Sequence, residues 1–475
     1  MNMENIRARV AADKDALIGT IRELVAVPSV NGPAESGAPF GAGPKAALEK
    51  FLEIGKRMGF RTWAFEDQVG IAEFGDESLP EMIAILAHVD VVPAADGWSC
   101  DPWQGKIEDG LVYGRGVADD KGPAVSALFA LKALREEGVR LKRRVRVLVG
   151  TNEELGSKAV HHYVESGQEL PVAGFTPDSG FPVTNGEKGI INCTCQLPFA
   201  APAEGTAVLC IKAGVAANSV PDKASAELRV PAASRARLAR VLAEFAAPRD
   251  AKLTCEYGEG DTVTLKMDGL AYHGARPQWG SNAAAHLVQV LRLLDLGAEQ
   301  TAALEKLDRM IGTQTRGENL GVMLYDDPSG FTSLCWGILR TEGDKLVFTV
   351  NYRYPVTYKM EPVRDALLAA LKANGVEITG NIRASRPLYM PEDCELVQKL
   401  MKVYREETGD LESKPKCIGG GTYAKEMPNM LAFGNQFVGE NCHIHEADER
   451  WSIDHIVSHT NIMAAAIAAL AGVEE

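Results

Sequence analysis

Acidic and imidazole side chains stand at or near the ends of apolar runs in this chain of 475 residues. Five of them could bind metal: His88, Asp119, Glu154, Asp178 and His445. Imidazole nitrogens and carboxylate oxygens are ligands of divalent ions of the zinc class, and a catalytic site keeps one coordination position open for water. Taken singly, each residue would more often cap a helix or face solvent. Their shared position relative to the apolar runs is what predicts a metal site.

The apolar runs predict the buried strands that would position these residues. They cover 82–87, 145–150, 173–176 and 430–434, and a helix is expected from about 123 to 137. Short apolar runs that alternate with amphipathic helices are typical of a parallel sheet with crossover helices. Ligands of such sheets bind outside the carboxyl ends of the strands. We therefore expect an α/β fold whose strand ends bring acids and imidazoles to one rim.

Residues 114–122, with the sequence GRGVADDKG, form the sharpest single motif. Glycines permit a tight backbone there and leave Asp119 at the start of a helix. The segment lacks both the GxGxxG spacing and the GK[ST] ending of nucleotide-binding loops. We interpret it as a loop that presents a carboxylate.

The order of these motifs resembles metallopeptidase family M20. The likeness rests on His88-Val89-Asp90, GRGVADDKG, Glu153-Glu154, Pro177-Asp178 and the segment from His445 to Glu449, and it extends over nearly the whole chain. A long insert adds a closer likeness to the dipeptidase branch, the PepV-like and carnosinase-like enzymes. The resemblance implies an α/β, mostly parallel-sheet zinc-peptidase catalytic domain, residues 1–185 and 386–475, with an inserted α+β lid domain at 186–385.

The resemblance also implies a ligand set for two divalent ions, with zinc favoured and manganese or cobalt as alternatives. Asp119 would bridge the two ions. His88 and Asp178 would complete one site, and Glu154 and His445 would complete the other. One departure from the family pattern, an alanine at 447 where many relatives have proline, does not touch a ligand.

Further residues would act on the substrate or on the ligands. Glu153, next to a ligand but free itself, is expected to act as the general base. Asp90 would hold the ring of His88 in the ligating tautomer. His273, in the segment AYHGARP, matches the lid histidine that stabilises the oxyanion. In the family the peptide bond that corresponds to Asp119-Asp120 is cis.

Four more residues are candidates for substrate binding. Arg353 would clamp the C-terminal carboxylate of the substrate, although it could equally be an arginine on a strand surface. Asn218 matches a lid asparagine that contacts substrate. Gly421 and Thr422 belong to a turn, GGGT, that resembles a carboxylate-binding turn of the family, since backbone N–H groups suit an anion.

These residues favour the hydrolysis of dipeptides or very short peptides. The alternatives are an N-acyl- or N-succinyl-amino-acid deacylase, which would use the same metals and base, and an inactive binding or scaffold protein of the same fold. The insert of roughly 200 residues is large on ordinary domain scales, and it resembles the branch of the family in which extra lid structure replaces the partner chain. This resemblance implies a monomer that supplies its own His273, with a homodimer as the alternative.

Composition excludes several classes of partner and location. A formal charge of −14 argues against binding to nucleic acid or an anionic membrane. The first residues mix charges of both signs without the apolar core of a signal peptide, and we expect no charge-free run long enough to span a bilayer. Nine scattered cysteines predict reduced thiols rather than a disulfide framework. We therefore expect a cytoplasmic protein.

Overall fold

The computed structural model describes residues 2–248 and 250–474. The chain forms two compact units. Unit 1 holds Met1–Gly186, Met390–Cys417 and Gly421–Glu475, and unit 2 holds Glu187–Tyr389 and Ile418–Gly420. Unit 2 is thus an insertion into unit 1, with a three-residue piece of the later chain added to it. Strands β20 (Leu388–Tyr389) and β21 (Lys416–Ile418) lie where the chain passes between the units.

Unit 1 is built on a mixed sheet with the strand order β1-β2-β6-β3-β7-β22-β8. The central strands β6, β3, β7 and β22 run parallel, while β1, β2 and β8 are antiparallel to their neighbours. The strands are β1 (Arg61–Phe65), β2 (Val69–Phe74), β3 (Met82–His88), β6 (Arg144–Gly150), β7 (Ala173–Thr176), β8 (Val183–Glu187) and β22 (Met430–Phe433). The four predicted runs are the parallel strands, so the expected α/β fold with a mostly parallel centre is confirmed.

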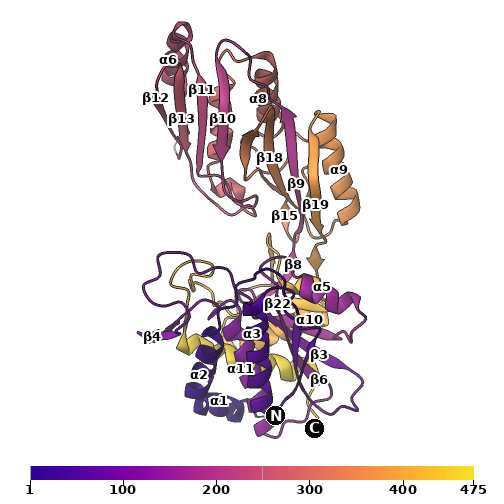
Figure 1. Ribbon diagram of the computed structural model, residues 1–475. Helices are drawn as coiled ribbons and strands as arrows, with labels where there is room; N and C mark the ends of the chain where they lie inside the picture. Colours follow the sequence, from indigo (N-terminus) through magenta and orange to yellow (C-terminus); the bar gives the residue numbers. More distant parts are fainter. Residues whose placement is uncertain (1, 249, 475) are drawn as a thin grey trace. The chain divides into compact units, whose positions relative to one another are not determined.

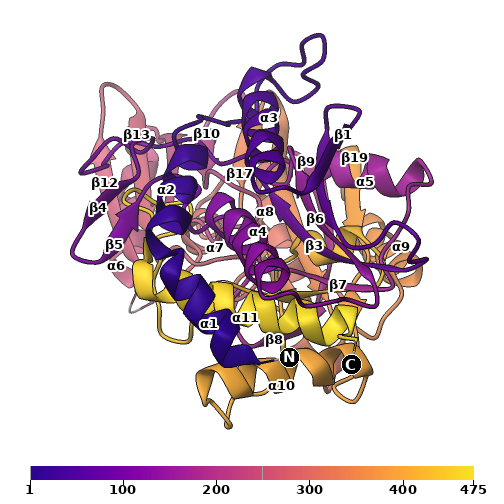
Figure 2. The ribbon, with the colours of Figure 1, turned by 90° about the horizontal axis from the view of Figure 1, so that it is seen from below.

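The helices of unit 1 pack on this sheet and on one another. They are α1 (Met3–Ala12), α2 (Lys14–Val25), α3 (Ala42–Arg57), α4 (Lys121–Glu136), α5 (Lys158–Glu165), α10 (Glu395–Thr408) and α11 (Ile453–Ala471), with the 3-10 turn η3 (Tyr423–Glu426). Strands β4 (Lys106–Glu108), β5 (Leu111–Tyr113) and β23 (Arg450–Ser452) form a small separate sheet. Figure 2 shows α4 and α11 lying against each other. Helix α4 is rich in Ala and Leu, and its Pro123 sits in the first turn, where a missing N–H costs nothing.

Helix α11 corrects one expectation. By length and composition it could cross a membrane, since its apolar window has a mean hydropathy of 1.2. However, 61% of that window is buried inside the structure. A helix that is apolar on most sides is also what the core of a globular domain requires. We therefore describe α11 as the core helix of unit 1.

Unit 2 is an α+β unit on an antiparallel sheet with the strand order β12-β13-β11-β10-β17-β18-β9-β19, to which β16 adds at β18. The strands are β9 (Gly189–Pro198), β10 (Ala207–Ala213), β11 (Lys223–Arg229), β12 (Lys252–Tyr257), β13 (Thr262–Asp268), β16 (Ser333–Cys335), β17 (Leu339–Glu342), β18 (Lys345–Tyr354) and β19 (Glu377–Ser385). Figure 1 shows β12, β13, β11 and β10 side by side. A short hairpin joins β14 (Tyr325–Asp326) to β15 (Gly330–Phe331).

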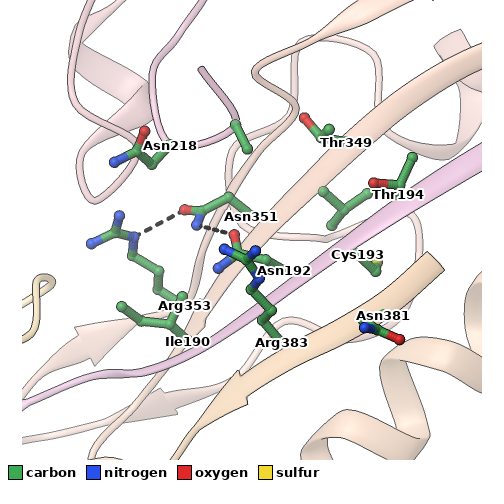
Figure 3. A pocket seen from close by; sticks show the side chains of 12 residues that line it. Ile190, Asn192, Cys193, Thr194, Asn218, Thr349, Asn351, Arg353, Asn381 and Arg383 are labelled. Carbon is green, nitrogen blue, oxygen red and sulfur yellow. Dashed lines mark hydrogen bonds between the residues drawn. The ribbon is translucent and has the colours of Figure 1, made fainter. Parts of the chain in front are cut away.

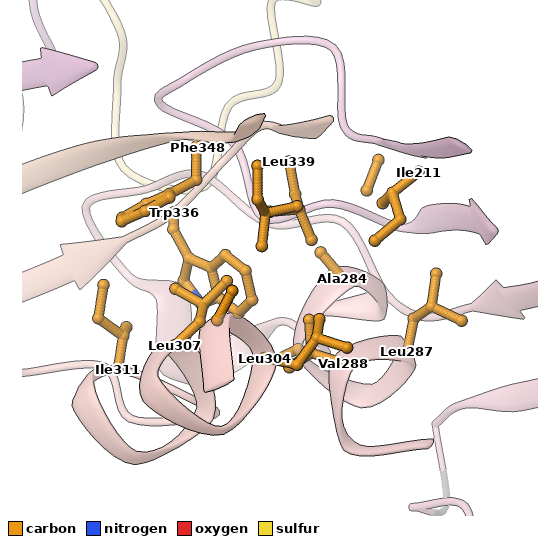
Figure 4. Packing of buried hydrophobic residues seen from close by; sticks show 14 of the residues in the cluster. Ile211, Ala284, Leu287, Val288, Leu304, Leu307, Ile311, Trp336, Leu339 and Phe348 are labelled. Carbon is orange, nitrogen blue, oxygen red and sulfur yellow. The ribbon is translucent and has the colours of Figure 1, made fainter. Parts of the chain in front are cut away.

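The apolar core of unit 2 lies between its sheet and its helices. The helices are α6 (Arg235–Glu244), α7 (Ala283–Leu291), α8 (Ala298–Met310) and α9 (Met360–Ala373), with the 3-10 turns η1 (Ala232–Ser234) and η2 (Pro277–Trp279). Figure 4 shows Leu307 of α8 beside Trp336, and Leu287 of α7 on the side of the cluster where Ile211 of β10 lies. The indole N–H of Trp336 donates to the carbonyl of Gly312 at 3.0 Å, so this large buried ring keeps its hydrogen bond.

Candidate functional site

The parallel strands of unit 1 end at one edge of the sheet. His88 is the last residue of β3 and pairs in register with Gly150, the last residue of β6. Strand β7, on the other side of β3, ends two residues before Asp178. Because parallel strands point the same way, the segments that follow them meet at this edge. The fold therefore gathers the Glu153-Glu154 pair, His88 and Asp178, as the sequence predicts.

Asp119 lies between the two histidines of the predicted ligand set. Its Oδ1 is 2.9 Å from His88 Nε2, and its Oδ2 is 3.0 Å from His445 Nε2. His445 Nε2 also lies 3.2 Å from Glu154 Oε1, and His88 Nε2 lies 4.0 Å from Asp178 Oδ2. The structure thus brings all five predicted ligands together. The two oxygens of Asp119 face two separate imidazoles.

The chemistry of this cluster fits divalent metal. Ligand atoms of His88, Asp119 and Glu154 lie within 4.8 Å of one another, and so do those of His88, Glu153 and Asp178. Nitrogen and oxygen donors at such spacings match a zinc-class ion. Glu153 belongs to the second group, whereas the sequence predicts that it is free of metal.

Burial and mutual repulsion perturb the acids of this cluster. Burial, together with the charge of Asp119, raises the pKa of Asp178 to about 7. Burial and the charge of Asp178 raise the pKa of Glu153 well above its usual range. The hydrogen bonds that His445 donates to the carboxylates of Asp119 and Glu154 raise the pKa of His445 to about 11. A nearby positive charge would stabilise the ionised form of carboxyl groups that are crowded in this way.

Asp90 contacts both the first histidine and the glutamate pair. His88 Nδ1 lies 2.9 Å from the backbone carbonyl of Asp90 and 3.6 Å from its carboxylate Oδ1. The carboxylate accepts the backbone N–H groups of Glu153 and Glu154 at 3.0 and 3.2 Å, and the Asn31 amide at 3.1 Å. The backbone carbonyl of Asp90 therefore faces the His88 ring, although the Asp90 side chain was expected to hold that ring. The Asp90 carboxylate instead fixes the backbone of Glu153 and Glu154.

A buried acid, Glu449, holds the loop that carries Asp119. Its carboxylate accepts the N–H groups of Gly116, Ala118 and Asp119 at 3.0 to 3.2 Å and forms a 2.6 Å ion pair with Arg115. In the sequence, Glu449 stands out only as the end of the segment from His445 to Glu449. Its role is not readable from local pattern, because its hydrogen bonds reach residues more than 300 positions away.

Two other features lie next to Asp119. The Asp119-Asp120 peptide bond is cis, as expected. The backbone N–H of His88 donates to Asp120 Oδ2 at 3.2 Å, and the ring of Tyr423 meets the His88 ring edge-on with centroids 5.9 Å apart. These contacts fix the orientation of His88 from several sides.

Three residues that were predicted to act on the substrate lie together in unit 2: Arg353, Asn218 and His273. Arg353, on β18, is buried; its Nε donates to Asn351 Oδ1 at 3.0 Å and its Nη1 donates to the Gly419 carbonyl at 2.5 Å. The backbone N–H of Gly274, next to His273, donates to the Asn218 carbonyl at 2.7 Å. Burial, with the charges of Arg353 and Arg276, lowers the pKa of His273 to about 4. His273 is therefore neutral near pH 7.

The glycine-rich turn is divided between the units. Gly419 and Gly420 belong to unit 2, whereas Gly421 and Thr422 belong to unit 1. Thr422 is the N-cap of η3, and its hydroxyl accepts the N–H of Ala424 at 3.2 Å. Thr422 therefore has a structural task as a helix cap.

Comparison with known proteins places the chain in a family. The family described as Peptidase family M20/M25/M40 matches residues 84–469. The Bacillus subtilis (strain 168) protein named "Putative dipeptidase YtjP" is 35% identical over 475 residues, which cover 98% of this chain and 100% of that protein. A Staphylococcus aureus (strain USA300) protein of the same description is 31% identical and covers 98% and 99% of the two chains.

A solved structure agrees with this placement at the level of the fold. Human carnosine dipeptidase 1 is 15% identical, with a TM-score of 0.58 and a coverage of 99% of each chain. With a family match over most of the sequence and relatives above 30% identity along its whole length, the chain belongs to peptidase family M20/M25/M40.

Proposed function

We propose that this protein hydrolyses dipeptides or very short peptides with two divalent ions that Asp119 bridges. The observation that carries the proposal is the placement of Asp119, whose two oxygens lie 2.9 and 3.0 Å from two different imidazoles. In this proposal His88 and Asp178 would hold one ion, and Glu154 and His445 would hold the other. Relatives described as dipeptidases support the substrate class.

Each residue of the cluster has a separate role in the proposed hydrolysis. When bound, the divalent ions polarise the scissile carbonyl and lower the pKa of a water molecule. Glu153 takes the proton of the attacking water and passes it to the departing amine. Its burial beside Asp178 raises the pKa of Glu153, which makes the ionised carboxylate a stronger acceptor for this proton. Asp90 keeps the glutamate backbone and the ring of His88 in place.

Unit 2 supplies the polar groups for the substrate in this proposal. Neutral His273 donates to the oxyanion, and Arg353 binds the C-terminal carboxylate, with Asn218 as a further contact. Gly421 and Thr422 assist in carboxylate binding. We further propose that the metal is zinc and that the enzyme is a cytosolic monomer which uses its own His273.

A panel of substrates tests the proposal. Free dipeptides and their N-acetylated counterparts are offered to chelated protein and then to protein restored with zinc or manganese. We expect chelator-sensitive cleavage of the free dipeptides only. Preference for the acylated compounds would instead identify a deacylase, and the absence of metal-dependent cleavage of either would indicate a binding or scaffold protein.

A further inference from the structure

The face of the unit 2 sheet that turns away from the apolar core carries a pocket of about 610 Å³. Strand β9 alternates there: Ile191 and Cys195 are buried in the core, while Asn192 and Thr194 lie on the opposite face and line the pocket. Figure 3 shows the polar side chains of β9, β18 and β19 gathered on this face. The pocket is therefore part of the sheet and is not a gap between loops.

A chain of side-chain hydrogen bonds runs across the floor of the pocket. Arg353 Nε donates to Asn351 Oδ1 at 3.0 Å, and Asn351 Nδ2 donates to Asn192 Oδ1 at 2.6 Å. Each of these bonds uses the amide oxygen of an asparagine. The amide N–H groups of Asn192 are then the donors left at the end of the chain. The hydrogen bonding of the floor thus presents donors to a ligand.

The charged side chains of the pocket also favour a negatively charged ligand. Its described lining residues include two arginines, Arg353 and Arg383, and no acid. Arg353 is 3% exposed, and the carbonyl of Gly419 and the amide of Asn351 are its hydrogen-bond acceptors. Arg383 is exposed and forms no ion pair with any residue that the structure describes. A buried arginine without a carboxylate partner is costly unless a ligand supplies the negative charge.

We propose that Arg383 and Asn192 form a second anionic subsite, which makes the enzyme prefer dipeptides whose C-terminal residue is aspartate or glutamate. This proposal rests on the proposed function, in which Arg353 binds the C-terminal carboxylate. The second subsite binds the side-chain carboxylate of the same residue. The ligand class is therefore a dicarboxylate amino acid at the C-terminal position.

The strand geometry allows one acidic residue to meet both arginines. Arg353 on β18 and Arg383 on β19 flank β9, and their partners on β9 are Ile190 and Asn192. Neighbouring strands lie about 4.8 Å apart, and the two partners are two residues apart along β9, so the two arginine backbones are separated by roughly 12 Å. Figure 3 shows the guanidinium of Arg383 beside Asn192. Long side chains from both flanks can thus converge on the two carboxylates of one residue.

The test compares substrates that differ only in this charge. Steady-state kcat/KM is measured for Ala-Glu and Ala-Gln, and for Ala-Asp and Ala-Asn, with the zinc-restored full-length protein. An exposed ion pair and a charge-assisted hydrogen bond together predict a preference of about threefold to tenfold for the acidic member of each pair. The preference should shrink as the salt concentration rises, because Arg383 is exposed.

Three variants separate the subsite from the rest of the chain. Arg383→Gln should bring the ratio of Ala-Glu to Ala-Gln close to one. Asn192→Asp keeps an oxygen for the Asn351 amide but replaces the free donor by a negative charge, so it should reverse the ratio. The control is Arg386→Gln, a nearby exposed arginine that pairs with Glu361 at 3.5 Å and does not line the pocket; its ratio should equal that of the wild type.

A binding measurement keeps this proposal separate from the proposed function. Calorimetry records the binding of Ala-Glu and Ala-Gln to the Glu153→Gln protein. The subsite is supported if Ala-Glu binds more tightly than Ala-Gln and if Arg383→Gln removes this difference. This result would count even if the wild type cleaves no dipeptide and the proposed function fails. Two results would overturn the subsite and leave the proposed function standing. One is equal binding of the two peptides together with their equal hydrolysis by the wild type. The other is a preference for Ala-Glu that persists in the Arg383→Gln variant.

Discussion

The two polar clusters of this molecule are built from opposite kinds of side chain. In unit 1, Asp119, Glu154 and Asp178 supply acceptor oxygens that crowd around His88 and His445. In unit 2, the described lining of the pocket presents guanidinium and amide N–H groups without a single carboxylate. Buried charge needs a partner of opposite sign. The first cluster therefore selects cations and the second selects anions.

This difference shows how an acidic protein can bind a negatively charged substrate. The chain carries a formal charge of −14, which by itself repels an anion. The metal ions of unit 1 and the arginines of unit 2 would each reverse that sign locally. Changes to either cluster should then have distinct signatures, one in metal content and the other in the choice of substrate charge.

The largest effect is expected from Asp119→Ala. Both ions lose a ligand, so metal content measured by mass spectrometry should fall at both positions, and kcat/KM should drop by more than about 10⁴-fold because the water loses its activation as well. Glu446→Ala is the matched control, since Glu446 is an exposed acid next to His445. A fully metallated Asp119→Ala protein would contradict the bridging role.

Glu153→Ala should separate catalysis from metal binding. Loss of the general base should lower kcat by about 10²- to 10⁴-fold, while the protein keeps both ions. The measurement pairs kcat with metal content. If the variant loses an ion instead, Glu153 is a ligand, in line with its place in the group with His88 and Asp178.

Arg353→Ala probes the anion-selecting pocket. Removal of a buried guanidinium from a carboxylate should lower kcat/KM for peptides with a free C-terminus by about 100-fold. C-terminally amidated peptides should lose much less, and metal content should not change. Arg340→Ala, an exposed arginine on β17 paired with Glu342, serves as the control. Equal losses on free and amidated peptides would argue against the clamp.

The smallest effect concerns the stability of the metal-free protein. The pKa of Asp178 is raised from 3.8 to about 7 in the folded state, so the unfolded state loses this proton first. The contribution of Asp178 to stability therefore falls as the pH rises from about 4 to 7. Asp178→Asn should reduce this fall of the Tm by at least about 2 °C. Asp454→Asn, at an exposed acid, should leave it unchanged. An equal pH dependence of the Tm in the metal-free wild type and in Asp178→Asn would refute the argument.

The sequence predicted much of the first cluster and little of the second. The apolar runs that became β3, β6, β7 and β22 are buried strands, and polar residues just beyond such strands share one edge of the sheet. The pocket of unit 2 offered no comparable signal. Asn192 and Asn351 are 159 positions apart, and only the antiparallel register of β9 and β18 pairs them.

The sequence by itself determined which donors and acceptors the chain possesses and which of them end a strand. It determined the imidazole of His88, the carboxylates of Asp119 and Asp178, and a parallel fold that could bring them together. The tertiary structure decided what each group meets. It placed the Glu449 carboxylate within hydrogen-bonding distance of the backbone of the loop that carries Asp119. It also divided the glycine-rich turn between the two units. Hydrogen-bond partners depend on positions that only the packed chain brings within about 3 Å, so local pattern cannot specify them.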